Sequence, residues 1–171
     1  MDLKNYIRAI ADFPKEGILY YDISTLMKNS KAWKFAVDQM AESIQDYNAD
    51  LLFGIESRGF LLAAPIAYKL NCGVGMIRKK SKLPGKIISH SYQLEYGFDT
   101  LEIQADAMEK GGRAIIIDDF LATGGTMNAA IKLVNQLEVE VCAAACLAEL
   151  TFLNGRANML VPLRTLITFD Q

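Results

Sequence analysis

The sequence predicts a single α/β domain in which a mainly parallel β-sheet is flanked by helices. Two observations predict this class. The 171 residues contain no repeat, low-complexity run or Pro/Gly/Ser-rich linker, and this length suits one continuous core. Short apolar runs typical of buried strands alternate with stretches of helical periodicity. That order favours parallel strands with helices on both faces of the sheet.

The first strong pattern is an amphipathic helix over residues 31–47. Its apolar positions recur at spacings of three and four, and Lys, Asp, Glu and Gln fill the others. The apolar stripe consists of Trp33, Val37, Met40, Ile44 and Tyr47. The apolar run 51–55 is too brief for a helix and suits a strand covered on both faces. A second apolar helix, 60–70, follows it.

The second half of the chain continues this order. Residues 73–77 predict a strand, and the polar, basic stretch 78–97 has no sustained period, which makes it a candidate flexible lid. Further strands are expected at 113–117, 141–147 and within 160–169, a turn at 118–126, and a helix at 127–137. In such sheets ligands bind beyond the carboxyl ends of the strands. The loops after residues 55, 77, 117 and 147 should therefore line one crevice.

The net charge and the first ten residues indicate which partners and which cellular compartment to expect. The formal net charge of −2 gives no electrostatic reason to expect a nucleic acid or an anionic membrane as a partner. Any positive site must be local. Asp2, Lys4 and Arg8 interrupt the first ten residues, which lack the apolar stretch of a signal peptide. We expect a cytoplasmic protein.

The strongest chemical signal is AIIIDDFLATGGT, residues 114–126. Gly124 and Gly125 allow positive φ and a close approach of the backbone to a ligand, and Thr123 and Thr126 offer hydroxyls beside the free amides of a helix N-terminus. This arrangement binds a phosphate. Asp118 and Asp119 repel a phosphate but can accept hydrogen bonds from sugar hydroxyls or assist a divalent cation. A phosphorylated ribose satisfies both halves.

Other phosphate-binding patterns fit poorly. The turn lacks the Gly-Lys-Ser/Thr of a nucleotide-hydrolysing P-loop, and no third glycine completes Gly73-Val74-Gly75 as a dinucleotide fingerprint. The structural alternative is that the glycine pair makes a tight turn and the acids cap the helix after it.

Several separate segments carry a resemblance to one family. Residues 114–126 resemble the ribose-phosphate motif of type I phosphoribosyltransferases, and the longer DDFLATGGTMNAA resembles their adenine-specific branch. Similarity extends along nearly the whole chain. It is carried by DFPKEGILYYDI from residue 12, ESRGF from 56, RKKSKLPG from 78, LEYG from 94, AEL from 148 and NGR from 154.

The resemblance implies a role for each part of the crevice. Residues 122–126, namely Ala122, Thr123, Gly124, Gly125 and Thr126, would hold the 5′-phosphate, and Asp118 and Asp119 the ribose hydroxyls. Ser57, Arg58 and Gly59 would hold the pyrophosphate, after a cis peptide bond between Glu56 and Ser57. An arginine at a helix N-terminus opposes the helix dipole, so an anionic ligand explains Arg58 better than a solvated surface role.

A basic run opens the candidate lid. Arg78, Lys79, Lys80, Lys82 and Lys86 place five positive charges within nine residues. Such a run is commonly a solvated face. By the resemblance, Arg78, Lys79 and Lys82 would form a pyrophosphate clamp.

The resemblance places the base pocket at Leu19, Tyr20, Tyr21 and Phe120. Adenine would lie between the side chains of Tyr20 and Phe120, and backbone groups near Leu19 would read its edge. Ordinary core packing is the alternative for these aromatic rings. The sequence departs from the family twice, because Tyr21 stands where arginine is usual and Phe120 where leucine is common.

The resemblance also implies the chemistry. Glu95 would handle a purine proton during attack on phosphoribosyl pyrophosphate, with Tyr96 beside it and Arg58 stabilising the leaving pyrophosphate. A solvated loop acid is the alternative for Glu95. We expect Mg²⁺ as the cofactor, held mainly by substrate oxygens, with no metal site made of protein side chains. We also expect a homodimer. The products would be AMP and pyrophosphate. The alternatives to an adenine-specific enzyme are a phosphoribosyltransferase for a 6-oxopurine and a non-catalytic sugar-phosphate sensor.

Overall fold

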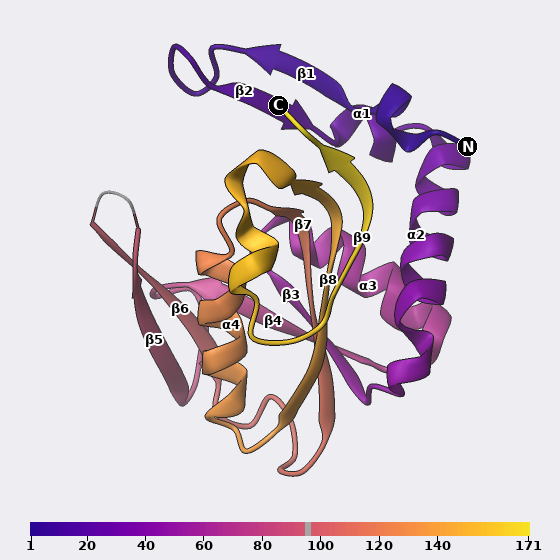
Figure 1. Cartoon of the computed structure of the whole chain (residues 1–171). Coiled ribbons are helices and arrows are strands. Elements are labelled where there is room, and N and C mark those ends of the chain that lie inside the picture. The colour runs from indigo at the N-terminus through magenta and orange to yellow at the C-terminus, as the bar shows by residue number, and fades with distance from the viewer. Residues whose placement is uncertain (95–96) are drawn as a thin grey trace.

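The computed structural model describes residues 1–94 and 97–171, so Glu95 and Tyr96, to which the sequence assigned catalytic roles, lie outside the described residues. A seven-stranded sheet forms the centre of the molecule, in the order β5-β6-β4-β3-β7-β8-β9 (Figure 1). Five strands run parallel. They are β3 (Leu51–Ile55), β4 (Gly73–Lys79), β7 (Arg113–Leu121), β8 (Glu140–Leu150) and β9 (Leu163–Phe169). The predicted fold class, a mainly parallel sheet with flanking helices, is confirmed.

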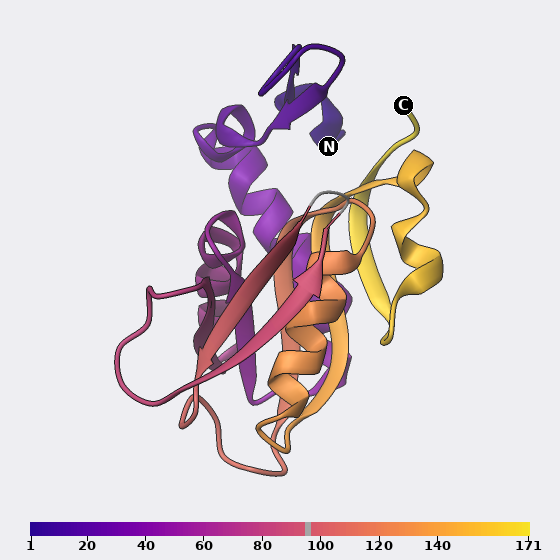
Figure 2. The same cartoon turned by 90° about the vertical axis from the view of Figure 1, so that its left-hand side faces the viewer.

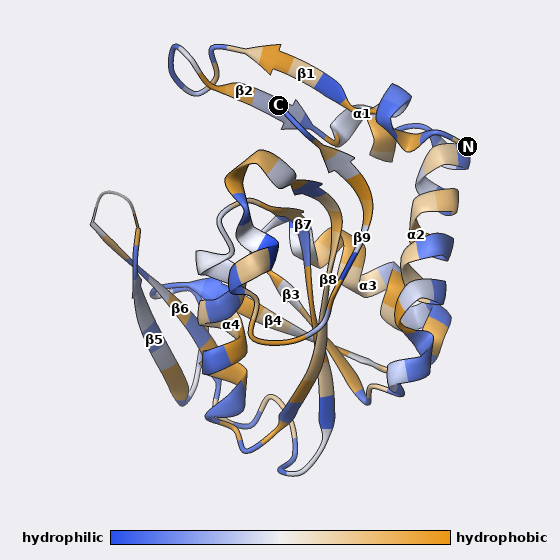
Figure 3. Cartoon of the chain, viewed as in Figure 1, coloured by the Kyte–Doolittle hydropathy of each residue, from blue (hydrophilic) through white to orange (hydrophobic). Residues whose placement is uncertain are grey.

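Helices cover both faces of this sheet because the strands alternate apolar side chains between them. Leu52 packs with α2 (Ser30–Ile44) and α3 (Arg58–Leu70) on one face, and its neighbour Phe53 packs with α4 (Gly125–Asn135) on the other. Coloured by hydropathy, the central strands are mainly apolar, whereas α2 and α4 carry both polar and apolar residues (Figure 3). Among the described helices, none combines the length and the apolar character that crossing a membrane requires.

A small separate sheet lies above the carboxyl ends of the parallel strands. It pairs β1 (Arg8–Ala11) with β2 (Leu19–Asp22) in antiparallel register, and both chain termini lie on this side of the molecule (Figures 1 and 2). We call this β1–β2 sheet the hood. The remaining short elements are η1 (Leu3–Tyr6), α1 (Ser24–Met27), η2 (Gln45–Tyr47), η3 (Thr151–Leu153) and η4 (Gly155–Asn158).

The segment predicted as a candidate lid contains one strand of a β-hairpin. Within 78–97, β4 continues to Lys79 and β5 (Ile87–Gln93) pairs antiparallel with β6 (Phe98–Gln104). The prediction of no regular structure was wrong here. Ile88, His90 and Tyr92 are half-buried and alternate with more exposed neighbours, which is a strand pattern hidden by its polar composition.

The strand that carries the two acids is longer than predicted. The apolar run stops at residue 117, but β7 continues to Leu121 because β8 pairs alongside it as far as Glu149. Asp118 and Asp119 therefore lie within the strand and not in the following turn. Hydrogen bonding to a neighbouring strand, which local composition does not reveal, sets this boundary.

Candidate active site

The glycine-rich turn connects β7 to α4 and has the predicted special backbone at one of its two glycines. Gly124 has φ +86°, a left-handed conformation that favours glycine, whereas Gly125 is the first residue of α4 and is helical. The expectation of positive φ at Gly125 was wrong. A Cβ at Gly124 would lie 3.0 Å from the carbonyl oxygen of Gly155, so the turn also packs tightly against η4.

A cavity of about 110 Å³ lies inside this turn. This volume has room for a group larger than one water molecule. Larger hollows, of about 510 and 540 Å³, lie on other parts of the surface, so size does not mark the site. The small cavity is lined by Asp118, Phe120, Leu121, Ala122, Thr123, Gly124, Thr126 and Met127. The structure thus brings four of the five predicted phosphate residues and one predicted ribose acid to one place, whereas Gly125 does not line the cavity.

The two acids on β7 are held in poorly solvated surroundings. Asp119 is 6% exposed, and Asp118, although it keeps some accessible surface, is enclosed by protein atoms on nearly every side. Burial, and next the charge of Asp119, raise the pKa of Asp118 well above its ordinary value. An Asp118 oxygen accepts the backbone N–H of Asp119 at 2.8 Å. Asp118 is therefore fixed in place and costly to keep charged, which is common at functional sites.

Arg58 links the acid pair to the hood. Its Nε lies 2.5 Å from Oδ2 of Asp119 and its guanidinium hydrogen-bonds the hydroxyl of Tyr20. The ion pair lacks hydrogen-bond geometry, and the Asp119 Oδ2 atom has no hydrogen-bond donor among the described residues. A buried carboxylate oxygen without a donor is unfavourable unless a ligand hydroxyl fills the place.

The β3–α3 connection lies directly against the acids. The Glu56–Ser57 peptide bond is cis, as the resemblance implied. Gly59 stands in the first turn of α3, where a Cβ would lie 2.7 Å from the carbonyl oxygen of Ile117 and 3.3 Å from the carboxylate of Asp118. The absence of a side chain at Gly59 lets the start of α3 pack on β7. Ser57, Arg58 and Gly59 therefore reach the crevice beside the acid pair.

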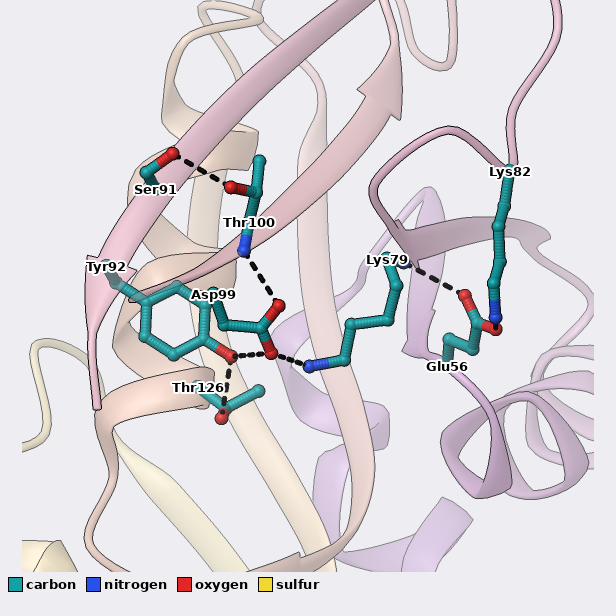
Figure 4. Close-up of polar contacts among 8 residues, drawn as sticks. All are labelled: Glu56, Lys79, Lys82, Ser91, Tyr92, Asp99, Thr100 and Thr126. Carbon is teal, nitrogen blue, oxygen red and sulfur yellow. Dashed lines mark hydrogen bonds and ion pairs between the residues drawn. The ribbon is translucent and has the colours of Figure 1, made fainter. Parts of the chain in front are cut away.

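Three predicted pyrophosphate ligands gather around Glu56, and two of them, Lys79 and Lys82, are drawn beside it in Figure 4. Lys82 Nζ lies 2.5 Å from Oε1 of Glu56, and Oε2 accepts the backbone N–H of Lys79 at 2.9 Å and Nε of Arg78 at 3.3 Å. Burial would raise the Glu56 pKa, but these hydrogen bonds outweigh it and lower that pKa to about 2. We call Glu56, Arg78, Lys79 and Lys82 the basic cluster.

A second chain of contacts involves two residues that the sequence analysis missed, Tyr92 and Asp99. The Lys79 ammonium pairs with Oδ2 of Asp99, and the Tyr92 hydroxyl donates to the same oxygen at 3.3 Å. Tyr92 also lies 3.1 Å from Oγ1 of Thr126, in the predicted phosphate turn (Figure 4). The alternation of Ile88, His90 and Tyr92 with small or polar residues was the available signal for Tyr92, because a period of two marks a strand with one face toward the body of the molecule.

Aromatic side chains meet where the base pocket was predicted. Tyr21 stacks on Phe169 at 3.9 Å between ring centroids and lies 6.1 Å from Phe120, while Tyr20 contacts Phe13 and the guanidinium of Arg58. The Tyr21 hydroxyl donates to the carbonyl of Gln171 at 2.7 Å, which ties the hood to the last residue. The placement of adenine between Tyr20 and Phe120, and the edge contacts near Leu19, stay predictions.

Comparisons with known proteins identify the family. The model of the phosphoribosyl transferase domain matches residues 25–157. The adenine phosphoribosyltransferase of Rhodospirillum centenum is 54% identical, with 99% of each chain covered.

Two solved structures have the same architecture. The adenine phosphoribosyltransferase of Thermoanaerobacter pseudethanolicus has a TM-score of 0.95 and 44% identity, with 98% of each chain covered. The Saccharomyces cerevisiae enzyme, complexed with D-2,5-dideoxy-2,5-imino-altritol 1,6-bisphosphate and adenine, has a TM-score of 0.90 and 37% identity, with 96% of each chain covered. This chain belongs to the phosphoribosyltransferase family and, within it, to the adenine phosphoribosyltransferases.

Proposed function

We propose that this chain transfers the 5-phosphoribosyl group of phosphoribosyl pyrophosphate to adenine, giving AMP and pyrophosphate. The observation that carries this proposal is the cavity in which Asp118 and the glycine turn meet. It places the carboxylate of Asp118, which could bind a sugar hydroxyl, beside the glycine turn, whose backbone amides could bind a phosphate. The yeast structure, which holds adenine and a bisphosphate ligand, supports the same assignment.

In this reaction a ring nitrogen of adenine bonds to the anomeric carbon while the bond from that carbon to the pyrophosphate oxygen breaks. The leaving pyrophosphate takes the bonding electrons, so negative charge grows at the end of β3 and β4. Arg58, Lys79 and Lys82 lie there and would stabilise that charge. Asp118 and Asp119 would orient the ribose by accepting hydrogen bonds from its hydroxyl groups. A role for Glu95 in moving the purine proton stays a prediction.

Magnesium is proposed as the cofactor, held mainly by oxygens of the substrate. Among the described residues no cluster of three or more His, Cys, Asp or Glu side chains could hold a metal ion. Asp118 and Asp119, the carboxylates proposed to hold the ribose, would assist the ion beside the substrate oxygens. When bound, magnesium would supply positive charge to the departing pyrophosphate.

The direct test is to incubate the purified chain with adenine, phosphoribosyl pyrophosphate and Mg²⁺ and to follow AMP by chromatography. We expect AMP and pyrophosphate in equal amounts. Competing adenine with guanine, hypoxanthine and xanthine in one mixture tests base selectivity. A preference for a 6-oxopurine would defeat the adenine assignment, and no turnover with any base would favour a sugar-phosphate sensor.

We also propose a homodimer, as the resemblance implied. Large apolar side chains remain exposed on α3 and on the neighbouring β4: Tyr68 is 90% exposed, Val74 52%, Leu61 48% and Met76 47%. Apolar surface of this kind marks protein–protein contact sites. Light scattering should give twice the mass of the 19.0 kDa chain. A cytoplasmic location is the accompanying prediction.

A further inference from the structure

We propose that Tyr92 is a positioning residue that makes the 5′-phosphate site and the pyrophosphate site compete with each other. The inference rests on the proposed function, which supplies the two anions. It concerns a hydroxyl on β5 that touches neither predicted anion. Tyr92 would act through the two groups that do the binding, Thr126 on one side and Lys79 on the other.

The contacts form one continuous path across the site. The Tyr92 hydroxyl lies 3.1 Å from Oγ1 of Thr126 and donates to Oδ2 of Asp99 at 3.3 Å. That same Oδ2 pairs with the ammonium of Lys79. The other Asp99 oxygen is occupied by the backbone N–H of Thr100 at 2.8 Å, which fixes the carboxylate (Figure 4). Tyr92 is half-buried, so water competes weakly for its hydroxyl.

The number of hydroxyl protons along this path predicts that the two anions weaken each other's binding. A tyrosine hydroxyl donates one hydrogen bond and accepts others. Since the Tyr92 proton goes to Asp99, the Thr126 proton goes to the Tyr92 oxygen. A phosphate in the turn accepts but does not donate, so it requires the Thr126 proton. The Tyr92 hydroxyl then donates to the Thr126 oxygen instead of to Asp99. Asp99 is left with Lys79 as its remaining side-chain donor and holds it more firmly.

The reverse holds when pyrophosphate draws Lys79 away. Asp99 then depends on the Tyr92 proton, and the Thr126 hydroxyl is held toward Tyr92. Each anion therefore binds less well when the other is present. The donor substrate brings both anions in one molecule, whereas after transfer they belong to two molecules, so this competition favours separation of the products.

The experiment measures pyrophosphate affinity by calorimetry at fixed Mg²⁺, with and without saturating ribose 5-phosphate. The ratio of the two dissociation constants is the coupling factor, which must be the same for either order of addition. In the wild-type chain, pyrophosphate should bind more weakly when ribose 5-phosphate is present. Tyr92→Phe keeps the ring and removes the hydroxyl, and we expect it to reduce the coupling factor by about 2- to 10-fold, the range of one hydrogen bond.

Ser91→Ala is the matched control. Ser91 is exposed on the same strand, and its hydroxyl lies 2.9 Å from that of Thr100 across the hairpin (Figure 4). This variant also removes one hairpin hydroxyl but leaves the path from Thr126 to Lys79 intact, so its coupling factor should equal that of the wild type. Direct repulsion between the two anions is common to all variants and cancels in the comparison.

Asp99→Asn provides a second break in the path and carries the test if Tyr92→Phe does not fold. It should reduce the coupling factor to the same degree, and the double variant should show no further loss. An unchanged factor in either variant, or an equal change in Ser91→Ala, overturns the proposal. If the wild-type chain binds neither anion, the proposed function fails as well, whereas binding of both with unchanged coupling removes this inference alone.

Discussion

The two halves of the site are built in opposite ways. In the half made by β7 and the glycine turn, the Asp119 Oδ2 atom pairs with Arg58 but has no hydrogen-bond donor among the described residues, and a left-handed Gly124 shapes a small cavity. In the basic cluster, by contrast, the cations already have acidic partners: Arg78 and Lys82 pair with Glu56, and Lys79 pairs with Asp99. The first half is formed in advance, and the second must exchange partners when an anion binds.

This difference indicates how the free energy of binding is divided. A preformed polar cavity loses little conformational freedom on binding and favours a tightly held ribose phosphate. Internal acids keep the basic cluster ordered and reduce its net charge, so it gains less from pyrophosphate than free cations would. Weaker ground-state binding of the leaving group is useful, because only interactions that strengthen in the transition state raise the rate.

The largest effect should come from the preformed half. We expect Asp118→Asn combined with Asp119→Asn to lower kcat/KM for AMP formation by at least about 100-fold, because a misplaced ribose loses its alignment for attack. Steady-state kinetics with varied phosphoribosyl pyrophosphate measure this. The control is Asp46→Asn with Asp106→Asn, two exposed acids at the opposite end of the sheet. A double variant at 118 and 119 with full catalytic efficiency would contradict the proposed reaction.

The second prediction concerns partner exchange in the basic cluster. Glu56→Gln removes the internal anion while keeping the shape of the side chain, so pyrophosphate affinity at low salt should rise by up to about tenfold, with the excess lost in high salt. Calorimetry with pyrophosphate and Mg²⁺ measures it. Asp38→Asn is the matched control, because Asp38 also pairs with two lysines, Lys34 and Lys69, but on the exposed surface of α2 and α3.

The same substitution has a pH signature. The folded-state pKa of Glu56, about 2, is below the ordinary 4.5, so its pairs stabilise the fold fully above pH 4.5 and lose this contribution as pH falls toward 2. Glu56→Gln should therefore reduce the free energy of unfolding by about 1–2 kcal/mol at pH 7 and by less in acid. Unchanged pyrophosphate binding in this variant would mean that the basic cluster does not exchange partners.

The third prediction separates stability from activity. Burial and the charge of Asp119 raise the pKa of Asp118, so the charged carboxylate destabilises the fold at neutral pH. Asp118→Asn should raise the free energy of unfolding by about 1 kcal/mol and Tm by about 2–4 °C while activity falls. Linkage gives the sign of this effect. Because the folded-state pKa of Asp118 is raised, its protonated form contributes stability below pH 3.8, and this contribution is lost as pH rises. The stability advantage of Asp118→Asn should therefore disappear in acid.

Asp22→Asn is the control with the opposite sign. The backbone N–H of Ser24, the guanidinium of Arg8 and the Ser24 hydroxyl lower the Asp22 pKa to about 2, so its charge stabilises the fold at pH 7. Thermal unfolding should show a lower Tm for this variant. Equal losses of stability in both variants would mean that Asp118 is not strained by its surroundings.

The sequence predicted those parts of the fold and site that depend on local chemistry. The strand before residue 118, the helix after Gly125 and the left-handed Gly124 follow from apolar periodicity and from the conformational freedom of glycine. What it could not provide depends on contacts between distant segments. The extension of β7 to Leu121 needs β8 alongside it, and the contact of Tyr92 with Thr126 needs the hairpin to fold back over α4.

The smallest effect is expected within the basic run itself. Lys79 and Lys80 are neighbours of the same charge, but the Lys79 ammonium reaches the site through Asp99, whereas Lys80 is exposed and, in the part of the chain that the structure describes, has no ion pair. Lys80→Ala should change kcat/KM by less than about twofold, because an exposed charge is largely screened. Lys79→Ala, measured beside it, should lower kcat/KM by at least about tenfold. Equal losses in the two variants would mean that the run acts through its total charge. The contrast between a preformed half and a half whose cations are paired with internal acids would then lose its basis.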